Sequence, residues 1–482
     1  MKHSFTKSNI FRKLTALVMA AAVAVSAYGA ALTGSAYNFT PTEYNDDGEL
    51  EDIRLYSESV YMVNLTTGET IVDINSDVER APASLTKIMT AIVMLDQIGS
   101  DERMLKETRV SAGTEAFDEL YDTGASTADI QPYEDVSYYD LLGALLVPSA
   151  CEASNIIAIN VAGSIPEFVD LMNEKVEELG LEHTHFSNAH GLFTQQNYST
   201  AHDMQIIAQY AYEHYTVFRE IVNMEDFYMD PTDYHPDGTY LTNTNYMLSS
   251  YSDYYYPRCK GIKTGTTDAS GRCLASIASD GDFDYMIVTM GAPMDKLPED
   301  YAKGSEDPSS VYADDVIYYN LLDHIHLYNW AYSMLVSTDF INENSEITDI
   351  PVAYGKKLDY ANLRPAESYS RMWPVSVPVD DVEQIITLKE NVVAPVEIGD
   401  VLGTLELRYE GETLAKIDLI STTQVERSPI KTKTKVVKSY FRSNVFRTTA
   451  LIIIAGVVIY GIVFFILIQR RYLRKKTKKK SS

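Results

Sequence analysis

The sequence predicts an α+β fold, in which one antiparallel sheet carries helices, followed by a small all-β domain and a C-terminal transmembrane helix. Three observations predict this class. Strand patterns occur early in the chain and again much later, helical periodicity fills the stretch between them, and short strands broken by turns follow at residues 347–426. Strands that flank helices in this way are typical of one sheet completed from both ends of a domain.

The sheet is expected to begin with a hairpin, whose strands cover residues 59–64 and 69–74. Its later strands are expected at residues 260–264, 272–278 and 285–290, and the loop 265–271 joins the first two of these. Alternating apolar residues bounded by turn residues favour strands in all of these segments.

The helices between these strands are marked by apolar spacing and by their end signals. One helix starts just after Pro82 and carries an apolar stripe. Another, over residues 166–179, has Pro166 near its start and Gly180 just past its end, as helices prefer. Further helices are expected at residues 137–147, 152–161 and 317–334.

Both ends of the chain carry apolar segments beside basic residues. Residues 1–36 have the layout of a secretory signal peptide, because basic residues precede a short apolar run that ends in small residues. Residues 448–468 contain no charge and, as a helix, span about 31 Å, which matches the hydrocarbon thickness of a bilayer. The basic tail at residues 469–482 is expected to stay in the cytoplasm.

These signals divide the chain into an ordered series of parts. A catalytic domain over residues 52–336 and a small β-domain over residues 347–426 are expected outside the membrane. Residues 427–447 then form a basic linker, which serves as a spacer or contacts anionic lipid headgroups. The sequence therefore predicts a single-pass protein of the cell membrane with an extracytoplasmic catalytic domain.

The charge of the exported part excludes one class of partner. The two end segments hold 12 of the 40 basic residues and none of the 68 acidic ones, so the remainder carries a formal charge of −40. Nucleic-acid binding needs a basic surface, and an anionic substrate would need a local cationic pocket. The three cysteines, Cys151, Cys259 and Cys273, match no zinc or redox spacing and are expected to be free thiols.

Two motifs carry residues suited to acyl transfer. Ser84 and Lys87 lie one helical turn apart, at a helix start where N–H groups point outward and can stabilise an oxyanion. The spacing alone is weak evidence, because Ser428 and Lys431 show it too. Lys263, at the end of a late strand, supplies a second cation that would favour a neutral amine on Lys87, and a neutral amine can act as a base.

The order of these motifs resembles that of a known family. A serine-x-x-lysine motif, then Ser149 at a helix junction, then Lys263-Thr264-Gly265 on a strand, is the pattern of penicillin-recognising enzymes. The wider motifs resemble those of low-molecular-weight penicillin-binding proteins, the serine-type D-alanyl-D-alanine carboxypeptidases, over roughly residues 55–335. These motifs are at residues 80–90, 186–192, 243–245 and 261–265.

The resemblance implies a penicillin-binding/β-lactamase-like transpeptidase fold and a role for each matching residue. Ser84 would attack the carbonyl between the terminal D-alanines of a peptidoglycan stem peptide, and Lys87 would take its proton. Ser149 would relay a proton to the departing amine, while Lys263, Thr264 and Gly265 hold the substrate's terminal carboxylate. The backbone N–H groups of Ser84 and Thr266 would form the oxyanion hole, water would hydrolyse the acyl-enzyme, β-lactams would inhibit by acylating Ser84, and no metal or cofactor would be needed.

One residue departs from the family pattern. The middle motif of the family usually ends in asparagine, and this chain has Cys151, whose thiol is a weak hydrogen-bonding group. We interpret Cys151 as a tolerated variant at a substrate-binding position, and a weakened or inactive enzyme as the alternative.

Other interpretations stay open at this stage. A serine β-lactamase shares the architecture, but the loop glutamate of class A enzymes is not identifiable. A non-catalytic wall-binding protein, an endopeptidase and a transpeptidase are further alternatives. His183, His185 and His190 lack metal-ligand spacing, and Arg272 is interpreted as a surface residue in preference to a carboxylate-binding one.

Overall fold

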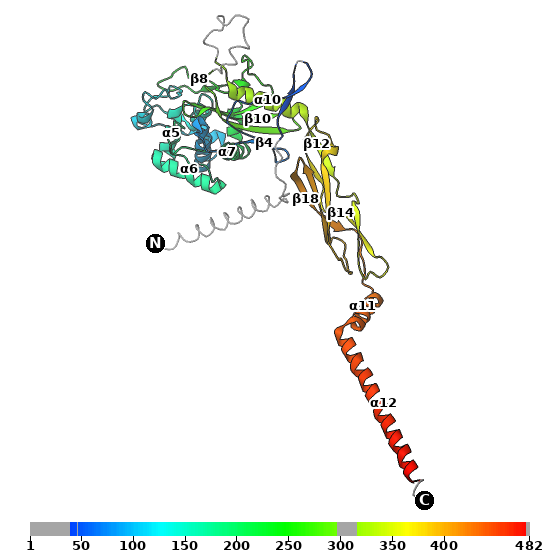
Figure 1. Ribbon diagram of the computed structural model, residues 1–482. Coiled ribbons are helices and arrows are strands. Elements are labelled where there is room, and N and C mark those ends of the chain that lie inside the picture. Colours follow the sequence, from blue (N-terminus) through cyan, green and yellow to red (C-terminus); the bar gives the residue numbers. More distant parts are fainter. Residues whose placement is uncertain (1–38, 46, 296–315, 479–482) are drawn as a thin grey trace, which may run out of the picture. The chain divides into compact units, whose positions relative to one another are not determined.

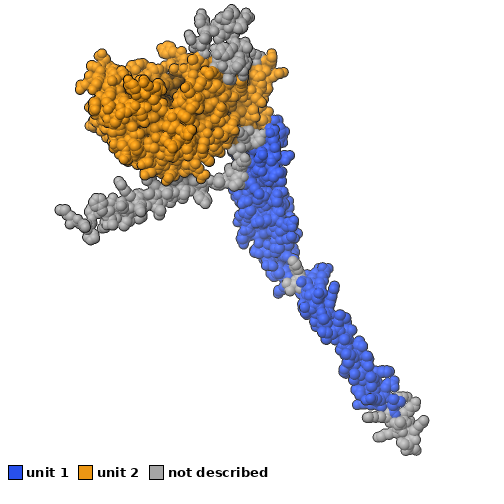
Figure 2. All heavy atoms as spheres, turned by 60° about the vertical axis from the view of Figure 1, so that its left-hand side comes forward, with its two compact units in different colours: residues 1–35, 339–370, 378–482 blue, residues 36–338, 371–377 orange. Residues whose placement is uncertain are grey.

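The computed structural model describes residues 39–45, 47–295 and 316–478 (Figure 1). It consists of two compact units, shown in orange and blue in Figure 2: residues 36–338 with 371–377 form the larger unit, and residues 339–370 with 378–482 belong to the other. The predicted signal peptide lies outside the described residues. Each unit is considered by itself below.

The larger unit is built on a five-stranded sheet with the strand order β4-β3-β11-β10-β9. Every neighbouring pair in it is antiparallel, so the early hairpin and the late strands form one sheet, as predicted. The strands are β3 (Ser59–Asn64), β4 (Glu69–Ile74), β9 (Cys259–Thr267), β10 (Gly271–Ser279) and β11 (Asp284–Ala292).

The hairpin β3–β4 shows why these residues form strands. All six residues of β3 are buried, and valines and an aromatic residue fill it, which suits the pleated core of a sheet. In the turn, the Asn64 side chain accepts hydrogen bonds from the N–H groups of Thr66 and Thr67, at 2.9 and 3.2 Å. Such a side-chain-to-backbone turn reverses the chain without help from distant residues.

Helices cover both faces of this sheet. On one face, α7 packs against β3 and β11, together with the buried side chains of α2, α4 and α5. On the other face, α10 packs against β10 and β11. The helices are α2 (Thr86–Ile98), α3 (Glu102–Glu107), α4 (Tyr138–Leu146), α5 (Cys151–Ala162), α6 (Ile165–Leu179), α7 (Ala201–His214), α8 (Thr216–Val222) and α10 (Tyr319–Met334).

The helix ends carry local signals. Ser137 accepts a hydrogen bond from the N–H of Asp140 at 3.0 Å and so caps α4, which was predicted. Thr200 caps α7 in the same way, although α7, like α3 and α8, was not among the helices predicted from the sequence. Helix α6 carries Pro166 in its first turn and ends at Gly180, whose φ of 72° is the left-handed conformation that glycine tolerates. The local sequence therefore determines where these helices begin and end.

Some elements of the larger unit differ from the predicted ones. Strand β9 continues to Thr267 and β10 begins at Gly271, so the loop between them covers residues 268–270 and is shorter than the predicted loop 265–271. Three pairs of short strands, each strand two to four residues long, were not predicted. They are β1 (Thr42–Tyr44) with β2 (Leu50–Asp52), β5 (Arg109–Val110) with β6 (Val136–Ser137), and β7 (Asp226–Met229) with β8 (Thr239–Thr242). Such short ladders leave little periodicity in the sequence.

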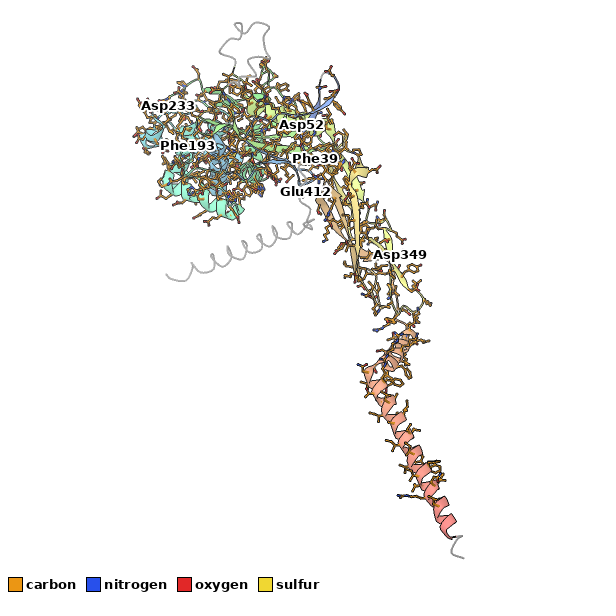
Figure 3. All side chains as sticks on the ribbon, in the orientation of Figure 1. Phe39, Asp52, Phe193, Asp233, Asp349 and Glu412 are labelled. Carbon is orange, nitrogen blue, oxygen red and sulfur yellow. The ribbon has the colours of Figure 1, made fainter. Side chains whose placement is uncertain are left out.

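The other unit contains an all-β domain with the strand order β13-β14-β18-β17-β16, and all of these pairs are antiparallel. Asp349 in β13 and Glu412 in β18 lie toward opposite ends of this sheet (Figure 3). Its strands are β13 (Thr348–Pro351), β14 (Tyr360–Pro365), β16 (Glu383–Leu388), β17 (Val401–Tyr409) and β18 (Glu412–Ser421). Strands β12 (Leu335–Ile341) and β15 (Tyr369–Pro374) form a two-stranded sheet, and residues 335–338 and 371–374 of it belong to the larger unit.

The predicted basic linker is helical in the structure. Ser428 caps α11 (Pro429–Arg442), and Pro429 occupies its first turn, both strong helix-start signals. Helix α12 (Asn444–Lys478) follows after one residue and extends beyond both ends of the predicted span at 448–468. Within it, Asn444–Arg471 is long and apolar enough to cross a membrane.

Candidate active site

Ser84 and Lys87 lie together at the start of the first long helix. Ser84 is in a 3₁₀ turn, Ala83–Leu85, which leads directly into α2. The Lys87 Nζ atom lies 3.0 Å from Ser84 Oγ, and the lysine side chain is fully buried. Its other contacts are the backbone carbonyl of His190, at 2.5 Å, and the sulfur of Cys151, at 3.4 Å.

The backbone around Ser84 is tightly enclosed. Ala83 has a φ of 48°, in the left-handed region that is costly for a residue with a Cβ atom. Gly191 approaches so closely that a Cβ atom on it would lie 2.0 Å from the Ala83 carbonyl oxygen. A Cβ atom on Gly265 of β9 would lie 3.1 Å from the backbone nitrogen of Ser84. The two glycines therefore allow the chain to pack around the strained turn that presents Ser84.

Ser149 and Cys151 lie at the junction of α4 and α5. Ser149 has a φ of 70° and is buried, and its Oγ atom has no hydrogen-bond partner among the described residues. Cys151 is the first residue of α5, and its backbone N–H donates to the carbonyl of Ser126 at 2.8 Å. A buried hydroxyl without a partner is rare, and this one is available to a substrate.

Lys263 and Thr264 occupy the middle of β9. Lys263 is buried, its Nζ atom donates to the Thr264 carbonyl at 3.1 Å, and burial together with the nearby Lys87 charge lowers its pKa well below the usual range. The Thr264 hydroxyl lies 2.5 Å from the hydroxyl of Thr244. Thr264 of strand β9 therefore lines the cavity described below, whereas the Lys263 side chain is buried and does not line it.

A cavity of about 260 Å³ opens over these residues. Its walls come from seven separate stretches of the larger unit. The lining residues are Ser84, Ser126, Ser149, Thr244, Tyr246, Thr264, Gly265, Thr266, Arg272, Tyr318, Asn320 and Leu321.

Arg272 corrects the sequence interpretation, which favoured a surface residue. It lines the cavity, its guanidinium lies 4.4 Å from the ring centroid of Tyr318, and its Nε atom is buried with no hydrogen-bond partner among the described residues. Pairing with Thr266 across β9 and β10 places it beside the predicted substrate-holding strand. Sequence reasoning missed this because the ring over Arg272 comes from a distant segment.

Sequence reasoning also missed Ser126, Tyr246, Tyr318 and Asn320 as cavity residues. Ser126 lies in a loop without periodicity, and Tyr318 and Asn320 lie at the start of α10, which the sequence suggested only as a closing helix. Their position near the site follows from tertiary packing alone. Thr244 is the exception, because the motif at residues 243–245 pointed to its neighbourhood.

The three histidines considered as metal ligands, His183, His185 and His190, have other partners in the structure. Buried His190 places its Nε2 atom 3.1 Å from Glu119, and burial lowers its pKa. His183 pairs with Glu79, and the ring of His185 contacts the Gln196 carbonyl. Within the ranges the structure describes, no three histidine, cysteine or acidic side chains are grouped to hold a metal ion. The thiols of Cys151, Cys259 and Cys273 are buried and unpaired.

The sheet, the pair of Ser84 and buried Lys87 and the late-strand Lys-Thr-Gly motif together define a serine acyl-transfer enzyme of the penicillin-recognising class. A family model described as D-alanyl-D-alanine carboxypeptidase matches residues 47–294. A second model, described as the C-terminal domain of penicillin-binding protein 5, matches residues 337–427.

Individual relatives agree with these matches. The D-alanyl-D-alanine carboxypeptidase DacF of Bacillus subtilis (strain 168) is 27% identical over 413 residues, which cover 85% of this chain and 94% of the relative. DacA of Escherichia coli (strain K12) is 27% identical over 368 residues, 76% of this chain and 82% of the relative. The crystal structure of DacD from Francisella tularensis shares the fold, with a TM-score of 0.59, 22% identity and coverage of 78% of this chain and 95% of that one.

The chain belongs to the D-alanyl-D-alanine carboxypeptidase family, as its motifs predicted. It is a serine peptidase of that family and therefore a hydrolase that forms an acyl-enzyme.

Proposed function

We propose that Ser84 is the nucleophile of this carboxypeptidase and that Lys87 is its general base. The observation that carries the proposal is the position of the buried Lys87 Nζ atom, 3.0 Å from Ser84 Oγ. A serine hydroxyl needs an adjacent base to become a useful nucleophile, and hydrogen-bond distance to that base is the first geometric requirement.

The contacts of Lys87 suit a neutral amine. A neutral amine has two N–H donors and one lone pair. The His190 carbonyl can only accept, so it takes one N–H, and the sulfur of Cys151 is available for the second. The lone pair then points to Ser84 Oγ and accepts its proton.

The reaction then proceeds in two steps, acylation of Ser84 and hydrolysis of the acyl-enzyme. Ser84 Oγ attacks the carbonyl between the terminal D-alanines and loses its proton to Lys87, while the N–H groups of Ser84 and Thr266 stabilise the oxyanion. The C–N bond breaks, and the departing D-alanine amine receives a proton through the unpartnered hydroxyl of Ser149. Water, activated by the same lysine, hydrolyses the ester on Ser84 and restores the enzyme.

The terminal carboxylate of the substrate is bound at β9 and β10. Thr264, Thr266 and Arg272 line the cavity there, and the unpartnered Arg272 Nε atom is a charge-assisted donor for a carboxylate. Lys263 is buried behind this wall, so it acts chiefly through its charge, and an arriving carboxylate favours its protonated form. Gly265 keeps the strand close to Ser84.

The substrate class follows from the family. Its members act on peptidoglycan stem peptides and bind β-lactams, and a free carboxylate beside a reactive acyl group is common to both ligands. The protein is therefore proposed to trim the terminal D-alanine from stem peptides and to be acylated by penicillins at Ser84. Cys151, in place of the usual asparagine, contacts Lys87 and is proposed to weaken substrate positioning without preventing acylation.

The cell membrane is the proposed location. One apolar helix, α12, is long enough to cross a bilayer, and basic residues follow it. A single span with its basic end in the cytoplasm leaves both folded units on the outer side, where the peptidoglycan substrate lies.

Mass spectrometry after incubation with labelled penicillin tests the proposal. We expect one adduct, on Ser84, and release of D-alanine from a D-alanyl-D-alanine peptide; Ser84→Ala should lose both. Ser428→Ala is a matched control, because Ser428 has a lysine at the same spacing but caps α11. Undiminished D-alanine release by folded Ser84→Ala protein would disprove the assignment. Slow nitrocefin turnover would further separate the protein from a β-lactamase.

A further inference from the structure

One wall of the Ser84 cavity is an irregular loop, residues 121–135. Ser126 of this loop lines the cavity and also lines a neighbouring hollow of about 270 Å³. Ser126 therefore belongs to the lining of both hollows. The second one is lined by Phe117, Leu120, Tyr121, Ala125, Ser126, Thr127, Asp129, Ile130, Gln131, Pro132 and Glu152.

The first turn of α5 holds this part of the loop. The Cys151 N–H donates to the Ser126 carbonyl at 2.8 Å. Next to it, one carboxylate oxygen of Glu152 accepts two hydrogen bonds of 2.7 Å, from the Thr127 hydroxyl and from the Ala128 N–H. Glu152 is only 3% exposed, so water cannot readily replace these bonds. The turn that brings Cys151 to Lys87 thus also holds the cavity wall.

The loop that carries Ser126 is irregular. Residues 121–135 include no helix or strand, and three non-glycine residues in it, Asp122, Asp129 and Tyr133, have positive φ angles. At its far end, Glu134 accepts from the Gln131 N–H and contacts His235, at 2.7 and 2.9 Å. The side chains of Ala128 and Ile130 are buried in the core, and the bonds from Cys151 and Glu152 act beside this apolar packing in fixing residues 126–128.

We propose that Glu152 is a positioning residue, which holds residues 126–128 as the wall along which the acyl-donor part of the substrate lies. The proposal rests on the proposed function. A stem peptide extends beyond its two terminal D-alanines, and Ser126 lines the cavity over Ser84 where the preceding residue of such a peptide would lie. Glu152 lines the second hollow and not the cavity over Ser84, so it acts through the loop.

Two substitutions test the contact. Glu152→Gln removes the charge that accepts from the loop. Thr127→Val, at an exposed position, removes one donor to Glu152 together with the bond that its hydroxyl accepts from the Asp129 N–H at 2.9 Å. We expect Glu152→Gln to raise KM for an acylated tripeptide ending in D-alanyl-D-alanine by about tenfold, with kcat changed less than about threefold. The reason is that the wall contacts substrate and transition state alike. Thr127→Val should raise KM by about threefold, and the double variant should show less than the product of the two effects.

Matched variants separate positioning from general damage. Thr127→Ser keeps the hydroxyl and should restore the wild-type KM. Thr123→Val removes a hydroxyl bond within the same loop that does not reach Glu152, and should leave KM unchanged. Asp140→Asn alters another buried carboxylate, which lies in the first turn of α4 and accepts from the Ser137 hydroxyl at 2.7 Å, and should lower the unfolding temperature without raising KM.

The outcomes distinguish this proposal from the one it rests on. Unchanged KM in Thr127→Val, or a fall in kcat with constant KM in folded Glu152→Gln, would overturn the role of Glu152 while Ser84 still forms the penicillin adduct. If Glu152→Gln fails to fold, the KM values of Thr127→Val and Thr127→Ser test the role of Glu152 by themselves. Absence of an adduct in the wild type would overturn the proposed function first, and this inference with it.

Discussion

The Nζ atom of Lys87 and the sulfur of Cys151 lie 3.4 Å apart in a buried part of the active site. An asparagine at this position would offer an amide oxygen to the lysine and an N–H group to the substrate, both stronger hydrogen-bonding groups than a thiol. The position of Cys151 therefore bears on substrate alignment as well as on the base.

Replacing Cys151 with asparagine should change the rate of turnover and leave Ser84 open to acylation. One better hydrogen bond contributes about 1 kcal/mol, so we expect kcat/KM for a D-alanyl-D-alanine peptide to rise by roughly fivefold. Steady-state kinetics and labelled-penicillin binding measure the two effects. Cys259→Ala is the control, because this buried thiol contacts Asn245 and the Gly261 carbonyl and makes no contact with Lys87 among the described residues. Equal kinetics for Cys151→Asn and wild type would show that the thiol does not limit alignment.

A Cβ atom at Gly191 should damage catalysis more than folding. It would lie 2.0 Å from the Ala83 carbonyl oxygen, so the turn that presents Ser84 must move. Displacement of a reacting group by about 1 Å costs on the order of 100-fold in rate, and we expect that loss in the rate of Ser84 acylation for Gly191→Ala.

Gly180 supplies a close control for that substitution. Its φ of +72° resembles the +86° of Gly191, but a Cβ atom there meets nothing within 4 Å. Gly180→Ala should therefore cost about 1 kcal/mol of stability for the strained backbone and leave acylation unchanged. If both variants acylate at the wild-type rate, the close packing of Gly191 on Ala83 is not what positions Ser84.

Acid should destabilise the larger unit through His324. This histidine is fully buried between Ser276 and Thr289, at 2.6 and 2.9 Å, and burial lowers its pKa to about 3. In the unfolded chain a histidine binds a proton below about pH 6.5, so the unfolded state gains protons first and stability falls as the pH drops from about 6.5 toward 3. The loss is about 1.4 kcal/mol per pH unit, or about 2 kcal/mol at pH 5.

Urea unfolding at pH 7 and pH 5 checks this dependence. His324→Gln removes the titration, so it should be less stable than wild type at pH 7 and lose less stability on acidification. The gap between the two proteins should narrow by about 2 kcal/mol. His326→Gln, on the same helix but partly exposed, should keep the wild-type dependence. A constant gap would mean that His324 does not carry the acid sensitivity.

Local signals in the sequence were sufficient for much of the fold. The bounds of β3 and β4 were predicted from alternation and from the turn that Asn64 closes, and those of α6 from its proline and glycine. The motif order also led to the serine–lysine pair, because residue type and helical spacing place Ser84 beside Lys87 wherever the helix packs. Each of these features depends on neighbours in the sequence.

Features that depend on distant segments were not predictable. Arg272 becomes part of the cavity only because Tyr318, at the start of α10, covers it. Ser126 lines the cavity from an irregular loop that is hydrogen-bonded to Glu152 and Cys151 in the first turn of α5. The burial of Lys263 behind β9 likewise follows from packing and not from the Lys-Thr-Gly motif.

Removal of residues 443–482 should release the protein from the membrane without loss of activity. Helix α12 supplies the one apolar span proposed to cross the bilayer, and the truncation keeps both folded units and α11. An apolar helix of this length inserts essentially irreversibly, whereas a basic amphipathic segment binds the surface reversibly and in a salt-dependent way. We therefore expect the full chain in the membrane pellet at any ionic strength, and the truncated chain in the soluble fraction at high salt, still releasing D-alanine. A truncated chain that stays in the pellet at high salt would place the anchor elsewhere. Protease added to intact cells tests the orientation of the full chain, and digestion of a C-terminal tag would show that the orientation is the reverse of the proposed one.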